Sequence, residues 1–186
     1  MPTADVTGRS IRQCLRDATS SAHARLDDQL GPLALGSMDD YAAFLAIQYR
    51  ARIGIEAWLS GQSLDMVPPP QAALIASDLA ALGFPATDAA PAFAPAEQAQ
   101  PLGVCWVLAG SSLGNRAILA RLAGDASQRP TSFLSDTSMT IYWRDLLPRL
   151  QAPLAPGMEG ALVAGAQAAF AHFLAIAAAC PLREAA

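Results

Sequence analysis

The sequence predicts an all-α protein that forms a single domain over residues 1–186, with residues 1–9 as a flexible start. Hydrophobic residues make up 53% of the 186 residues, which is enough for one continuous core. Leucine and alanine dominate, while aromatic residues stay at 6%. Apolar and polar residues do not alternate over the length of a strand, so helices are favoured over sheets.

Two helices are expected at the beginning of the chain. The first should run from about Ser10 to Leu30, because apolar residues recur there at steps of three and four. Gly31 and Pro32, as helix breakers, should end it. The second should begin near residue 37, where a serine followed by an aspartate three positions later resembles a capping box.

Four further helices are expected. The third should end at Gly83, since glycine commonly follows the last residue of a helix. The fourth should span about Ala96–Leu122 and cross Pro101 near its start, and the fifth should follow Pro130 as one helix. The last is expected between about Met158 and Ala179, and its alanine-rich surface is stable only when packed in the core.

The pattern of apolar segments predicts neither a membrane span nor a secretory signal. The longest apolar runs are Val104–Ala109 and Phe173–Cys180, far short of the roughly 20 residues that cross a bilayer. Polar residues interrupt the N-terminal segment throughout, unlike the apolar centre of a signal peptide. We therefore expect a cytoplasmic protein.

Cysteine usage and charge exclude several classes of protein. The three cysteines lie far apart in sequence, without a C-x-x-C pair, and predict neither disulfides nor a zinc or iron–sulfur site. We expect Cys14, Cys105 and Cys180 to be reduced and buried. The net charge is −4 and the chain has no lysine, which argues against nucleic-acid binding because phosphate contacts need a basic surface.

His23 and Arg16 are the first candidate binding residues. His23 lies at the edge of the apolar stripe of the first helix, where a partly buried imidazole is expected. Position alone favours a packing role over ligation. Arg16 precedes it by two helical turns, about 10 Å along the axis, which matches the dimensions of a porphyrin. An arginine there would pair with a propionate, although an ordinary solvated arginine has the same pattern.

Three glycines in the fourth helix form the second candidate. Gly103, Gly110 and Gly114 are spaced by seven and four residues, which places them on one helix face without side chains. Each glycine costs a helix about 0.5–1 kcal/mol relative to alanine, so something must offset the loss. Two explanations remain open: close packing of another helix, or a flat ligand on the backbone with Ser111 and Ser112 beside it.

Two motifs resemble the heme oxygenase family. Residues Leu15–Asp27 read L-R-D-A-T-x-x-x-H-x-x-L-D and resemble the opening helix of heme oxygenases, in which the histidine is the proximal heme ligand. Residues Leu102–Asn115 resemble the distal helix, especially that of the bacterial form associated with phytochrome operons. Looser similarity extends over most of the chain.

The resemblance implies a multi-helical bundle that holds heme between the first and fourth helices. It implies that His23 is the iron ligand, that Arg16 is a propionate partner, and that Thr19 also contacts the heme. The distal wall, which would hold the catalytic groups and water, is implied to consist of Gly110, Ser111, Ser112, Gly114 and Asn115.

The activity implied by the resemblance is the oxidative cleavage of heme to biliverdin, carbon monoxide and ferrous iron. Heme would be both cofactor and substrate, and dioxygen the oxidant. Because the chain has no nucleotide-binding fingerprint, electrons must come from an external donor such as a ferredoxin or a reductase. Arg12, Arg16 and Arg116 would guide an acidic donor, and a bilin-binding photoreceptor is a further implied partner.

The chain departs from the family pattern at two positions. Ala109 stands where bacterial relatives often have glutamate, and Asn115 stands where they have a second glycine. Ser111 replaces the aspartate with which other members organise distal water. These departures threaten turnover more than heme binding, so two alternatives stay open: a heme- or bilin-binding protein without turnover, and a helical interaction module.

Overall fold

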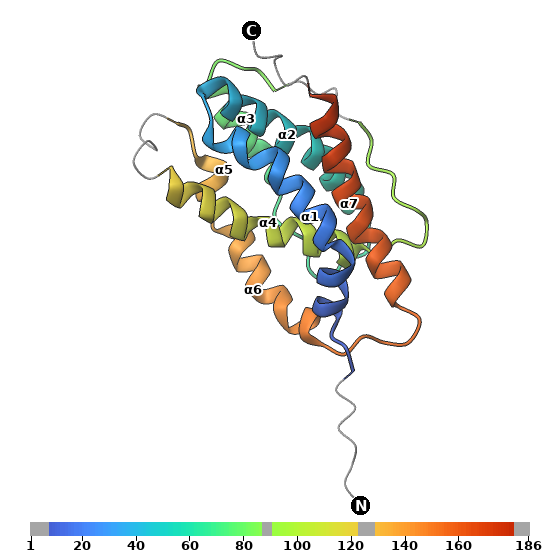
Figure 1. The fold of residues 1–186 in the computed structure, drawn as a ribbon. Helices are drawn as coiled ribbons and strands as arrows, with labels where there is room; N and C mark the ends of the chain where they lie inside the picture. The colour runs from blue at the N-terminus through green and yellow to red at the C-terminus, as the bar shows by residue number, and fades with distance from the viewer. Residues whose placement is uncertain (1–7, 87–90, 123–128, 181–186) are drawn as a thin grey trace, which may run out of the picture.

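The described part of the chain is entirely helical in the computed structural model, which covers residues 8–86, 91–122 and 129–180. The only strand-like pairing among these residues is an isolated bridge between Ser10 and Pro153. The prediction of an all-α fold is confirmed. In chain order the helices are α1 (Ile11–Leu35), α2 (Met38–Ser60), α3 (Ala72–Ala81), α4 (Pro101–Arg121), α5 (Ser132–Ser135), α6 (Ser138–Gln151) and α7 (Glu159–Ala179) (Figure 1).

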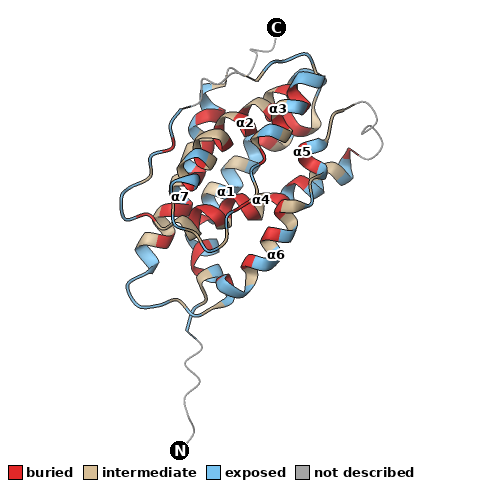
Figure 2. Ribbon diagram, turned by 180° about the vertical axis from the view of Figure 1, so that it is seen from behind, coloured by how far each residue is buried: buried red, intermediate tan, exposed pale blue. Residues whose placement is uncertain are grey.

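The helices pack around α4 and α7. α7 lies beside α1 and also packs against α4 and α2, while α4 contacts α6 and α5 on its other side (Figure 1). Figure 2 shows buried positions along α4 and along the inward sides of α2 and α7. All seven helices contribute residues to one hydrophobic core, so the expected placement of the last helix in the core is confirmed.

α1 begins where the sequence predicts and ends later. The Ser10 hydroxyl accepts a hydrogen bond from the Gln13 backbone N–H, and the Gln13 side chain accepts one from the Ser10 backbone N–H, which completes a capping box. The expected end at Gly31 and Pro32 is wrong, because the helix continues to Leu35 with Pro32 inside it. An internal proline costs about 3 kcal/mol. The final turn offsets this cost by burying Leu33 and its neighbour Ala34, since a buried leucine side chain contributes about 1.5–3 kcal/mol.

The beginning of α4 also differs from the expectation. The helix begins at Pro101 rather than near residue 96. Proline suits the first position of a helix, because its φ angle is already helical and its missing N–H would have no partner there. The ends of α2 at Gly61 and of α3 before Gly83 agree with their glycine signals, and Gly83 has a positive φ of 81°.

The single helix expected after Pro130 is divided into α5 and α6. Asp136 separates them with an extended backbone. Its carboxylate accepts hydrogen bonds from the Ser138 backbone and hydroxyl and from the Gln71 side chain. Burial alone would raise the pKa of the Asp136 carboxyl, but these bonds lower it overall. A charged carboxylate that caps α6 is therefore favoured over a continuous helix.

α4 and α7 approach each other closely through two glycines. A Cβ on Gly103 would collide with the Leu162 carbonyl and lie 2.8 Å from the Ala166 nitrogen. A Cβ on Gly165 would collide with the Gln100 carbonyl. Backbone therefore packs against backbone on both sides, and we call these two positions the glycine seam.

α4 and α7 are also long and apolar enough to cross a membrane by length and composition. Their most apolar 18-residue windows have mean hydropathies of 1.2 and 1.7, and 44% and 50% of these windows is buried inside the protein. Core helices of soluble proteins commonly have this composition. The glycine seam accounts for part of the burial, because each helix covers the other.

Candidate functional site

His23 lies on α1 with its ring held from two sides. Its Nδ1 is 2.9 Å from Asp27 Oδ2, one helical turn later, and its ring meets Phe170 edge-on with 5.8 Å between centroids. The expectation of a partly buried imidazole is wrong, because 59% of the side chain is exposed. Because Nδ1 is engaged by the carboxylate, Nε2 is the ring nitrogen left for a ligand, and a metal-binding histidine commonly has its other nitrogen bound to a carboxylate in this way.

Phe170 connects His23 to the interior. It is buried on α7, and its ring also meets Trp106 of α4 edge-on, with 6.4 Å between centroids. Trp106 Nε1 is buried without a hydrogen-bond partner. The rings of His23, Phe170 and Trp106 come from α1, α7 and α4. Phe170 therefore links His23 to the fourth helix through two ring contacts.

The glycines of α4 divide into two groups. A Cβ on Gly114 would meet nothing within 4 Å, and a Cβ on Gly110 would meet only Trp143 Cζ3, at 3.8 Å. Gly103 does not share their surroundings, because it belongs to the glycine seam. The expectation of one bare face with three glycines is therefore corrected: close packing explains Gly103, whereas a side chain would be accommodated at Gly110 beside Trp143 and would meet open space at Gly114.

The polar residues between these glycines bond to their own helix. Ser111 Oγ donates to the Leu108 carbonyl and Ser112 Oγ donates to the Ala109 carbonyl, both at 2.7 Å. Ser112 and Asn115 are buried, and Ser111 is half-buried. Their serine protons are thus engaged in the helix, and the oxygen lone pairs are the groups available to accept further hydrogen bonds.

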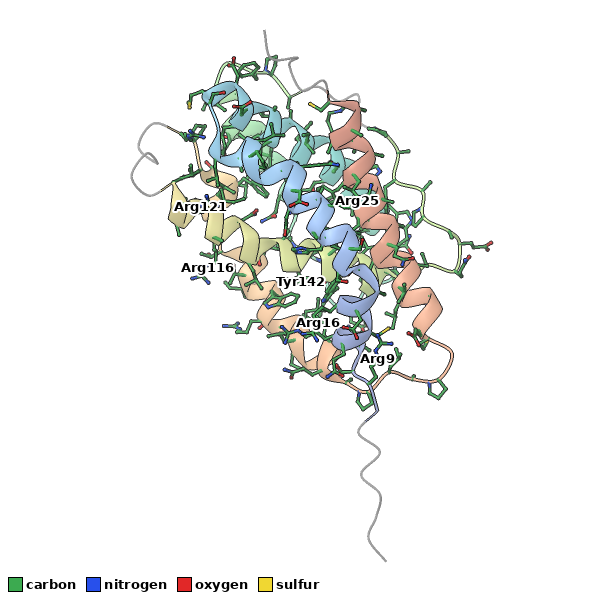
Figure 3. All side chains as sticks on the ribbon, viewed as in Figure 1. Arg9, Arg16, Arg25, Arg116, Arg121 and Tyr142 are labelled. Carbon is green, nitrogen blue, oxygen red and sulfur yellow. The ribbon has the colours of Figure 1, made fainter. Side chains whose placement is uncertain are left out.

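Arginines of α1 lie on the same side as the glycine pair. Arg12 stacks on Trp143 with 5.9 Å to the ring centroid, the same tryptophan that contacts the open face of Gly110. Arg16 is 70% exposed, and its Nε lies 3.7 Å from Asp17 Oδ1, a weak pairing that leaves the guanidinium able to bind an anion. Figure 3 shows Arg16 projecting from the first half of α1 and Arg116 from the second half of α4.

Thr19 lies inside the protein rather than on its surface. It is buried, and its hydroxyl donates to the Leu15 carbonyl at 2.7 Å. Its expected contact with a ligand therefore stays a prediction, and the structure gives it a packing role within α1.

Sequence reasoning missed Arg52, which is fully buried in the middle of α2. Its Nη2 donates to Ser111 Oγ at 2.7 Å, and its guanidinium lies 5.1 Å from the centre of the Phe133 ring. Burial lowers the pKa of Arg52 to about 10, against a smaller opposing effect of Glu56. The only signal in the sequence is a pair of arginines, Arg50 and Arg52, inside the apolar stretch of α2, and nothing in it distinguishes the buried one.

His172 belongs to a different part of the molecule. Its ring lies 5.3 Å from Phe93, and its buried Nε2 has no hydrogen-bond partner. Burial lowers the pKa of its imidazole, and a hydrogen bond to the Ala51 backbone partly opposes this effect. The two histidines therefore do not form a pair at the candidate site.

Two hollows of the protein lie away from the candidate site residues. One of about 410 Å³ is lined by residues such as Arg50 and Phe84, and one of about 340 Å³ by residues such as Trp58 and Phe93. Among the described residues, no three His, Cys, Asp or Glu side chains gather as a metal site. A group held by one imidazole and by backbone contacts does not need such a cluster. The three cysteines are free, two of them buried and Cys180 half-buried.

The fold is that of the heme oxygenases. A solved structure of heme oxygenase from Neisseria meningitidis, studied with NO and CO bound, is similar over 92% of this chain and 92% of its own, with a TM-score of 0.65 and 19% sequence identity. No family model matches the chain, and no curated protein matches it in sequence. The expected heme-oxygenase-like architecture is thus confirmed at the level of fold.

Proposed function

We propose that this protein binds heme through His23 and cleaves it oxidatively to biliverdin, carbon monoxide and ferrous iron. One observation carries the proposal: in a heme oxygenase fold, an exposed imidazole on α1 whose Nδ1 is held by Asp27 occurs together with uncrowded glycines on α4, Gly114 with open space beside it and Gly110 with only Trp143 nearby. The bacterial type associated with phytochrome operons is part of the proposal and rests on the similarity of Leu102–Asn115.

The residues of the site fit a flat, anionic, iron-containing ligand. His23 would supply one ring nitrogen to the iron, while Asp27 holds the other. A methyl group on Gly114 would occupy the open space, so glycine leaves room for a ring to approach the helix backbone. The exposed guanidinium of Arg16 suits a propionate.

Heme would supply both the iron that activates dioxygen and the ring that is opened. The protein's own groups would hold and orient it. His23 would ligate the iron, Arg16 would fix the rotation of the ring through a propionate, and the side-chain-free surface of Gly110 and Gly114 would leave room for small ligands. Ser111, Ser112 and Asn115 would accept hydrogen bonds from water in that space.

Electrons would come from a separate ferredoxin or reductase, because the sequence has no nucleotide-binding fingerprint. Biliverdin made in the cytoplasm would be available to a bilin-binding photoreceptor. Both partners and this location are part of the proposal.

A second candidate function is heme or bilin binding without turnover. Ala109 and Asn115 depart from the family pattern, and the Ser111 and Ser112 protons are directed to helix carbonyls rather than to the open space. Proton delivery would then be weak although the binding surface is intact.

The test begins with hemin titration of the purified protein. We expect a Soret band that is lost in His23→Ala and retained in the control His172→Ala, which removes the other histidine. Absence of a band, or a band unaffected by His23→Ala, would exclude a histidine-ligated heme and favour an interaction module.

Turnover is then tested by adding a reductant and oxygen in the presence of catalase. Conversion of the Soret band to biliverdin absorbance supports the enzyme. Intact heme after prolonged incubation would contradict turnover and leave the binding protein.

A further inference from the structure

Arg52 is a buried cation at the back of the distal helix. It extends from α2 toward α4, and none of its side chain is exposed. Moving a charge out of water is costly, so a buried arginine normally has a carboxylate in direct contact. None of the ion pairs formed by the described residues includes Arg52.

The nearest acidic group is committed elsewhere. Glu56 lies one helical turn after Arg52, but its carboxylate oxygens accept hydrogen bonds from the backbone nitrogens of Gln71 at 2.8 Å and Ala72 at 3.4 Å. Glu56 therefore raises the pKa of Arg52 through its charge, without forming an ion pair with it. With a pKa of about 10, Arg52 keeps its positive charge at neutral pH.

The shorter of the two hydrogen bonds made by the Arg52 guanidinium goes to Ser111. Nη2 donates to Ser111 Oγ at 2.7 Å, whereas the bond from Nε to Gln48 Oε1 is long, at 3.4 Å. Nη1 is buried and has no partner. Because the Ser111 proton is donated to the Leu108 carbonyl, the hydroxyl is held by two hydrogen bonds, at the residue that directly follows Gly110 in α4.

We propose that Arg52 is a positioning residue with two effects: it holds the Ser111 hydroxyl, and it places a fixed positive charge between α2 and α4. As a result, the space beside Gly110 and Gly114 favours small anionic ligands over neutral ones. The inference rests on the proposed function, because it assigns the ligand preference of the same site. Exposed arginines such as Arg12 and Arg16 act weakly there, since water and salt screen them, whereas a buried charge is screened much less.

The experiment compares azide, an anion, with imidazole, a neutral ligand, on the hemin-loaded protein by visible absorbance. In Arg52→Met we expect azide to bind about tenfold more weakly, the lower end of the effect of a nearby charge, with imidazole affinity unchanged. A merely structural role would weaken both ligands equally, and that result would overturn the inference.

Two further variants separate charge from shape. Arg52→Lys keeps the charge and is expected to retain azide affinity within about threefold. Arg50→Met removes the same charge from the same helix, at a side chain that lines the hollow beside Phe84, and should leave both affinities unchanged. Equal loss of azide affinity in Arg50→Met and Arg52→Met would also overturn the inference.

Ser111→Asp keeps Arg52 and neutralises it with a carboxylate, which covers the case in which Arg52→Met does not fold. We expect weaker azide binding, as in Arg52→Met, together with a melting temperature at or above that of the parent protein, because the buried cation gains a partner. A lower melting temperature with unchanged azide affinity would contradict the assignment.

Absence of a His23-dependent Soret band in the parent protein would overturn the proposed function and this inference with it. Normal heme binding without a preference for azide would overturn this inference alone.

Discussion

The two histidines of this chain show how the surroundings decide the role of the same side chain. His23 is exposed on α1 beside Asp27, whereas His172 is half-buried against Phe93. The imidazole of His172 has a lowered pKa because burial disfavours its charged form. His172 should therefore affect stability, while the exposed His23 is free of this burial and is the residue proposed to bind a ligand.

His172→Gln should reduce the loss of stability in mild acid. Above pH 6.5, the usual pKa, the imidazole is neutral in both states and contributes no pH dependence. Below 6.5 the unfolded chain takes up a proton before the folded protein does, so the parent protein loses stability until the lowered folded pKa is reached. Thermal melting at a series of pH values measures this difference. Parallel curves for the two proteins below pH 6.5 would contradict the expectation.

The candidate residues differ in how far the sequence could reveal them. The place of His23 on α1 follows from local periodicity, but its exposure depends on what the facing helices leave uncovered. Arg52 could not be recognised, because an arginine in an apolar helix usually lies on its solvent face. Its burial results from contacts with Ser111 and Phe133, which are distant in the sequence.

At the scale of elements, local signals predict where most helices begin and end. The capping pair predicted at Ser37 and the glycine stop predicted at Gly83 act through neighbouring residues only, and the structure confirms them, as it confirms the predicted helix start near Ser10. The errors occur where distant contacts outweigh local preference. Pro32 stays helical because the turn after it is buried, and Asp136 breaks a helix because Gln71 reaches it from another part of the chain.

Alanine substitutions should have opposite effects at two glycines of α4. Gly103→Ala should destabilise the apoprotein by at least about 1–3 kcal/mol, because its Cβ collides with the backbone of α7. Gly114→Ala should stabilise it by about 0.5–1 kcal/mol, because alanine is the better helix former and meets no neighbour. Urea unfolding of both variants measures the difference. Effects of equal sign would mean that the two glycines share one environment.

At the scale of the whole molecule, a net negative chain carries all twelve of its cationic side chains as arginines. Several of these, including Arg12, Arg16 and Arg116, are exposed on α1 and α4, the helices that carry the candidate site residues. Figure 3 shows Arg16 and Arg116 on these two helices. An acidic electron donor would be attracted to this part of an otherwise acidic protein, and the attraction would decrease with salt.

Arg12→Glu should slow reduction of the bound heme by an acidic ferredoxin by about tenfold at low ionic strength. The effect should diminish at high salt, where the charges are screened. Stopped-flow absorbance measures the rate, with Arg50→Glu as the control because it reverses an equal charge on α2. An unchanged rate in Arg12→Glu would contradict docking at this face.

The glycine seam gives the two ends of α4 different mechanical properties. Near Gly103 the helix is clamped against the backbone of α7, and no motion there is possible without separating two main chains. Near Gly114 nothing restrains it on the bare side. In the proposed heme site, widening of the space beside Gly114 would therefore come from movement of the C-terminal half of α4, so that the half proposed to meet the ligand would also be the half that moves.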